Sequence, residues 1–246
     1  MKYRNIALVC SLSMFAAIPA LAASEKSLFN VDYVNRDIAP AGTPAAFEVA
    51  FPNAQRSEAQ RTIGEDTFSF VPLAFIPLSD TRVALISTGA NECTSQACSG
   101  LNTVHYLEHS AGAPQYPYTL KGEWMDVGMT GVVGNPAIRW GWSANIADAP
   151  VLYTEAGGTW QGRSCTYAIL TELTESKPVE IARIPLHMSD ASSEEKAIKY
   201  DGEITDAEKG RSLTVSYSGT ESFQEIYKRG ADGKFQLEGK SRVPEC

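Results

Sequence analysis

The sequence predicts an all-β fold made of repeated antiparallel meanders, arranged as a β-propeller-like array or as a β-sandwich. Apolar runs along the chain are short and rich in Val, Ile, Tyr, Phe and Thr, the residue types that strands favour. Gly, Pro, Asp and Asn separate these runs, as is typical of turns. No segment keeps the 3.6-residue apolar period that a helix packed on a core would require.

The predicted strands follow one another along most of the chain. They are 28–34, 47–51, 67–76, 83–88, 103–109, 118–124, 138–142, 151–155, 166–173, 179–184, 196–204, 213–218, 223–229 and 234–239. Pro72 lies within the third run and Pro77 follows it. Because proline cannot donate a backbone hydrogen bond, that run is predicted to be an edge strand or a bent strand. Two short polar segments are predicted as helices instead, 57–63 and 192–199.

Three segments resemble one another, which predicts an internal repeat. They lie near 80–125, 148–187 and 209–240, and each reads as a strand, a loop with glycine, a second strand, a turn and a further strand. Such meanders bury one face against their neighbours when they repeat around an axis, as propeller blades do, and they can also build a two-sheet sandwich. Neither arrangement requires a domain boundary within the chain, so residues 23–246 are predicted to form a single all-β domain.

The first residues have the pattern of a secretory signal peptide. Lys2 and Arg4 precede an apolar run at 6–18, Pro19 follows, and small residues lead up to Ala22. The apolar run is shorter than the ~20 residues that cross a bilayer as a helix. We therefore expect residues 1–22 to be removed and no membrane span to remain. The charged start and the alanine-rich cleavage region are typical of bacteria, which predicts a periplasmic or secreted protein.

Cleavage would leave four cysteines, Cys93, Cys98, Cys165 and Cys246. An even number of cysteines in an exported chain predicts disulfides. Cys93 and Cys98 are close together in a polar loop, which favours a local bridge between them. Cys165 and Cys246 would then form the second bridge and tie the C-terminus to the fold.

The balance of charge excludes one class of partner. The chain has 21 Lys and Arg against 29 Asp and Glu, a net charge of −8. Nucleic-acid binding requires clustered cations that neutralise phosphates, so no nucleic-acid partner is expected. The glycine-rich segment 157–162 lacks the lysine of a phosphate-binding loop. Its glycines predict a turn or a close approach of backbone instead.

One motif points to metal chemistry. His105, Glu108 and His109 match the H-x-x-E-H pattern of inverted zinc peptidases. On a helix the two imidazoles would share one face and could share one ion. On a strand they would lie about 13 Å apart, since each residue adds ~3.3 Å. Because the segment is predicted as a strand, no metal or cofactor is expected, and a zinc-dependent hydrolase is the alternative function.

Aromatic residues in the middle of the chain are the candidate binding residues. Trp140 and Trp142 alternate around a glycine, and Trp160 with Gln161 lies at a glycine-rich turn. Trp, Tyr and Arg dominate the energetics of many contact surfaces, and Arg139 lies beside the first pair. The sequence predicts a non-catalytic binding or inhibitor module of the cell envelope. Its partner would be an envelope protein or a cell-wall ligand.

Overall fold

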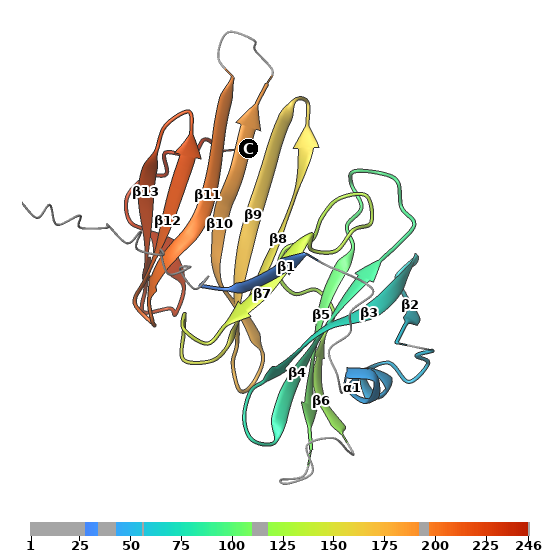
Figure 1. Ribbon diagram of the computed structural model, residues 1–246. Helices are drawn as coiled ribbons and strands as arrows, with labels where there is room; N and C mark the ends of the chain where they lie inside the picture. The colour runs from blue at the N-terminus through green and yellow to red at the C-terminus, as the bar shows by residue number, and fades with distance from the viewer. Residues whose placement is uncertain (1–27, 34–42, 56, 110–117, 192–196, 246) are drawn as a thin grey trace, which may run out of the picture.

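The computed structural model describes residues 28–33, 43–55, 57–109, 118–191 and 197–245 (Figure 1). These residues form two antiparallel sheets and one short helix, so the predicted all-β meander fold is confirmed. The predicted signal peptide at 1–22 lies outside the described residues. No helix among the residues described is both long and apolar enough to cross a membrane.

The larger sheet has nine strands and curls into a half-barrel (Figure 1). Each strand from β7 onward pairs with the next along the chain, and β1 adds at the outer side of β7. In sheet order the strands are β1 (Asn30–Tyr33), β7 (Arg139–Ser143), β8 (Val151–Trp160), β9 (Arg163–Leu173), β10 (Pro178–Asp190), β11 (Ile198–Glu208), β12 (Ser212–Gly219), β13 (Phe223–Arg229) and β14 (Phe235–Leu237).

Inside the curl lies the largest hydrophobic cluster, which includes Tyr153, Leu170, Ile184 and Val215. A buried ion pair also links strands that are distant in the sheet. Arg229 Nη2 of β13 lies 2.6 Å from Glu172 Oε2 of β9, and both side chains are largely shielded from solvent. Apolar packing and this ionic contact between distant strands therefore both hold the half-barrel.

The smaller sheet has five strands in chain order and carries the helix on one face (Figure 1). Its elements are α1 (Thr43–Ala50), β2 (Ala59–Ile63), β3 (Asp66–Pro77), β4 (Arg82–Ala90), β5 (Leu101–Glu108) and β6 (Thr119–Trp124). Phe47 of α1 and the following Phe51 pack in one cluster with Phe70 and Leu85 of the sheet.

A third cluster joins the two sheets. Ile76, Ile86 and Tyr106 of the smaller sheet pack together with Leu152 and Leu173 of the larger one. The described strands thus form two unequal sheets that share a core, rather than equivalent blades around an axis. The three predicted repeat segments contain β4–β6, β8–β10 and β12–β14 respectively, so the first lies in the smaller sheet and the other two in the larger.

Two local predictions were wrong. The run 47–51 is not a strand, because α1 covers most of it. Pro44 stands in the first turn, where its fixed φ favours a helix, and the buried Ala46, Phe47 and Ala50 lie on one side of the helix. The segment 57–63 is not a helix, because Ala59–Ile63 forms β2 and pairs with β3 through a tight turn.

The predictions for the proline-containing run 67–76 and for the helix 192–199 have different outcomes. β3 is bent as predicted, with a register shift between Pro72 and Ala74, and β2 pairs with it only as far as Phe70. Of the predicted helix 192–199, residues 192–196 lie outside the described residues, and β11 begins at Ile198.

Candidate functional site

The hairpin between β8 and β9 ends in a tight turn that presents Trp160. Gln161 and Gly162 form its two-residue loop, with φ of 47° and 83°. Two positive φ values in a two-residue loop define a type I′ turn, whose twist matches that of the flanking strands. Trp160 is 53% exposed and lies opposite Arg163 across the hairpin. The turn expected from the glycine-rich segment is therefore present.

The same segment also brings backbones close together. A Cβ atom on Gly157 would lie 1.9 Å from the backbone oxygen of Cys165. Only glycine avoids that overlap, so the predicted close approach of backbone is confirmed. A Cβ atom on Gly158 would lie 3.0 Å from Val132 Cγ1 on the facing segment, so the missing side chain there leaves room beside the hairpin.

That room is part of a cleft with a volume of about 660 Å³, within the usual range for small-ligand sites. The hairpin supplies one wall and segment 125–135, between β6 and β7, supplies the other. The hairpin wall includes Gly158, Trp160, Gln161, Arg163 and Tyr167, and the facing wall includes Met129 and Val132.

A buried asparagine fixes the second wall. The Asn102 amide of β5 donates hydrogen bonds to the backbone oxygens of Met129 at 2.7 Å and Val127 at 3.1 Å. Its side-chain oxygen accepts one from the Ala137 backbone N–H at 3.0 Å. The Met129 N–H in turn donates to Thr154 Oγ of β8 at 2.7 Å. Both sheets therefore position this wall.

The Cys93–Cys98 disulfide predicted from spacing is present, and its loop contacts the same wall. The Gly134 N–H donates to the Cys98 backbone oxygen at 3.2 Å, and the Gly100 N–H donates to that of Asn135 at 2.8 Å. The second predicted bridge, from Cys165 to Cys246, stays a prediction because residue 246 lies outside the described residues.

Several hydrogen-bond donors beside the cleft remain available. Arg163 Nε donates to Asp190 Oδ2 at 2.8 Å, which leaves the two terminal nitrogens of the guanidinium group. Within the described part of the chain these nitrogens, the Trp160 indole N–H and the Gln161 amide make no hydrogen bond. The cleft thus combines apolar walls with donors that a ligand can engage.

The structure separates these residues from the other predicted binding residues. Trp140 and Trp142 share one face of β7, as expected for alternating residues, but that face packs half-buried against the cluster between the sheets. Arg139 Nη1 lies 2.9 Å from Glu155 Oε2. Arg139 lines a different cavity of about 280 Å³ on the inner side of the half-barrel, with Tyr153. None of these three predicted residues lines the Trp160 cleft.

The H-x-x-E-H motif lies on β5 and its end, so the helix that a shared zinc site requires is absent. His105 is fully buried, with Nε2 3.2 Å from Glu123 Oε2. Glu108 pairs instead with Lys121, at 2.7 Å, and His109 packs edge-on against Tyr118. In the part of the chain that is described, no three metal-ligating side chains gather.

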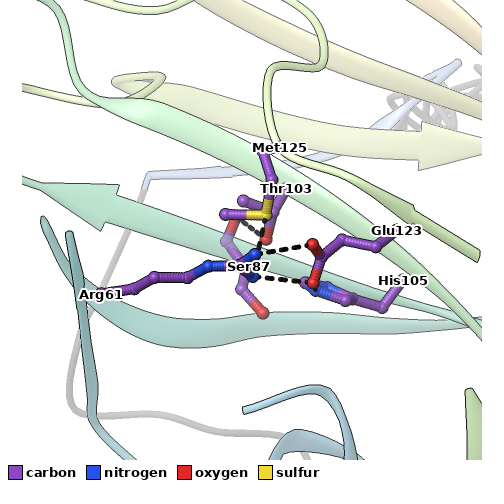
Figure 2. Close-up of polar contacts among 6 residues, drawn as sticks. All are labelled: Arg61, Ser87, Thr103, His105, Glu123 and Met125. Carbon is purple, nitrogen blue, oxygen red and sulfur yellow. Dashed lines mark hydrogen bonds and ion pairs between the residues drawn. The ribbon is translucent and has the colours of Figure 1, made fainter. Parts of the chain in front are cut away.

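His105 belongs to a polar cluster that sequence reasoning missed (Figure 2). Arg61 Nη1 and Nη2 lie 2.8 and 2.9 Å from the two oxygens of Glu123. Because β2 and β6 are the outer strands of the smaller sheet, this pair joins its two edges across one face. The sequence offers no local signal for it, since the partners are 62 residues apart.

Burial and charge shift the pKa values in this cluster. The Arg61 guanidinium lowers the pKa of Glu123, chiefly through its hydrogen bonds. Burial lowers the pKa of His105, although Glu123 acts in the opposite direction. The Phe51 ring packs edge-on against the His105 ring. The imidazole is therefore enclosed, and its contacts are those of a structural residue.

Comparison of the chain with models of protein families, with curated proteins and with solved structures yields no match. The site must therefore be interpreted from its own residues.

Proposed function

We propose that this chain is an exported, non-catalytic binding protein of the bacterial cell envelope, and that it binds a cell-wall ligand in the Trp160 cleft. The observation that carries this proposal is the exposed Trp160 ring on the wall of a cleft of ligand size. A large aromatic ring that stays in water lacks the favourable free energy of burial. A tight turn holds the Trp160 ring in this exposed position, and a ligand that covers the ring would gain that free energy.

Preorganisation also supports a binding role. The type I′ turn sets the direction of one wall, and Asn102 and Thr154 hold the other through hydrogen bonds. A site with fixed walls loses little conformational entropy when a ligand enters. The concave shape suits a small ligand better than a flat protein surface.

Two further observations support export. The first 22 residues have the composition of a signal peptide. The Cys93–Cys98 disulfide is typical of oxidising compartments such as the periplasm. A hydrolase based on the H-x-x-E-H motif has less support, because His105 and Glu108 are engaged by Glu123 and Lys121.

Isothermal titration calorimetry with soluble disaccharide-peptide fragments of peptidoglycan tests this proposal. We expect saturable binding by the mature protein and at least a tenfold loss of affinity in Trp160→Ala. Ile226→Ala removes a similarly exposed apolar side chain, 43% exposed, from β13, and it should leave the affinity unchanged. Absence of binding by the unaltered protein, or equal affinity in Trp160→Ala, would contradict the proposal.

A further inference from the structure

The donors beside the Trp160 ring restrict the chemistry of the ligand. Trp160 and Arg163 are the last cross-strand pair of the hairpin, so a flat apolar surface and a guanidinium group lie next to each other at the cleft. Gln161 adds an amide between them. A complementary ligand must therefore present an apolar face and, beside it, several hydrogen-bond acceptors.

We infer that the cleft recognises an acidic amino sugar, with the sugar ring against Trp160 and its carboxylate on Arg163. This inference rests on the proposed function and names the group that the cleft selects. The C–H face of a sugar ring is apolar and can pack on an indole, while ring hydroxyl and acetamido oxygens accept hydrogen bonds from Gln161 and the indole N–H.

The carboxylate is assigned by the geometry of Arg163. Its Nε is held by Asp190 at 2.8 Å, so the plane of the guanidinium group is oriented while both terminal nitrogens remain available. Two parallel N–H donors match the two oxygens of a carboxylate. Asp190 offsets part of the positive charge, so directed hydrogen bonds contribute more to recognition than net charge does.

The lining of the cleft is compatible with an anion. Among the described residues that line it there is no Asp or Glu, although the whole chain carries a net charge of −8. Within this described lining the cationic group that an anionic ligand meets is Arg163. The missing side chain at Gly158 leaves space for a ring between the hairpin and Val132.

A matched pair of sugars tests the inference. N-acetylmuramic acid and N-acetylglucosamine differ only in the lactyl ether that carries the carboxylate. We expect ligand-observed NMR titrations at pH 7 to show about tenfold tighter binding of the acidic sugar, since a charge-assisted hydrogen bond contributes at least that factor. Arg163→Gln should reduce the affinity for the acidic sugar to that of the neutral one and leave the neutral one unchanged.

Arg183→Gln is the matched control. The Arg183 side chain is 53% exposed against 52% for Arg163, it pairs with Glu180 through Nε, and it does not line the cleft. This variant should behave as the unaltered protein. Equal affinity for both sugars, with no effect of Arg163→Gln, would overturn the carboxylate assignment but leave the proposed function intact if Trp160→Ala still abolishes binding.

Two other outcomes overturn the inference in different ways. Binding of a triglutamate peptide with neither sugar bound would replace the sugar with an acidic peptide. Failure of both sugars, of the peptide and of peptidoglycan fragments would contradict the proposed function itself.

Discussion

The Asn102 side-chain amide donates a hydrogen bond of 2.7 Å to the backbone oxygen of Met129. Asn102 lies on β5 of the smaller sheet, whereas Met129 lines a cleft whose other wall belongs to the larger sheet. A single buried side chain thus links the packing of one sheet to the shape of the site on the other.

Asn102→Ala should lower the free energy of unfolding by about 3 kcal/mol, because it leaves several buried backbone groups without partners. Amide hydrogen exchange should also become faster in segment 125–137. Asn102→Asp is the informative comparison, since it keeps the acceptor for Ala137 and loses the two donated bonds. Unchanged exchange in both variants would show that the wall is held by other contacts.

Trp160→Ala should change the free energy of unfolding by less than ~0.5 kcal/mol, as is usual for exposed positions. Trp142→Ala should cost about 2 kcal/mol, because this half-buried ring packs against the cluster between the sheets. Urea denaturation of the two variants measures the difference. A loss of several kcal/mol in Trp160→Ala would identify that ring as part of the core instead of the binding surface.

The stability of the protein should decrease as the pH falls below about 6.5. His105 has a lowered pKa in the folded state because it is buried, whereas in the unfolded chain its pKa is ~6.5. Below that pH the unfolded state binds the proton more readily, so acid favours unfolding. His105→Gln should remove this part of the pH dependence in urea titrations between pH 7.5 and 5. If the unfolding free energy of His105→Gln changes with pH as steeply as that of the unaltered protein, His105 is not the source of this pH dependence.

Glu123 accounts for a second decrease at lower pH. Its pKa is lowered by Arg61 in the folded state, so its stabilising contribution is complete above the unfolded pKa of ~4.3. The contribution is lost as the pH falls through the lower folded value. Arg61→Gln should shrink this effect by raising the pKa of Glu123 toward its ordinary value, which NMR titration of the carboxyl group measures directly.

Arg229→Met should lower the free energy of unfolding by about 3 kcal/mol, because it leaves the buried Glu172 carboxylate without its ionic partner. The neighbouring Lys228 forms an exposed pair with Glu238. Lys228→Met should therefore cost less than ~0.5 kcal/mol. Thermal denaturation of both variants under identical conditions compares them. Equal losses of unfolding free energy in the two variants would mean that burial of the Arg229–Glu172 pair adds nothing to the stability of the protein.

Local patterns in the sequence predicted most strands because these strands are short β-branched or aromatic runs between turn residues. They failed where that pattern and the packing disagree. The run 47–51 contains two phenylalanines, yet its apolar spacing suits the single helical face that covers Phe70. The segment 57–63 is polar, yet β2 pairs at the edge of a sheet where polar residues are tolerated.

The candidate site could be predicted only in part. Trp160 was placed at a turn because glycines cluster in segment 157–162, whereas the strands extend to Trp160 and from Arg163, beyond their predicted ends at 155 and 166. The opposing wall at 125–135 has no periodic pattern, and it depends on Asn102, a residue that directly precedes the predicted strand 103–109 and has no local signature of its own. The pairing of Arg61 with Glu123 depends on the curl of a whole sheet, which no local pattern specifies.

The most direct test follows the four tryptophan indole N–H resonances in NMR spectra while soluble peptidoglycan fragments are added. Trp160→Phe assigns the Trp160 signal. Binding in the cleft predicts a saturable shift of that signal, with those of Trp140 and Trp142 unchanged. Shifts confined to Trp140 and Trp142, or no shift at all, would contradict a binding site at Trp160.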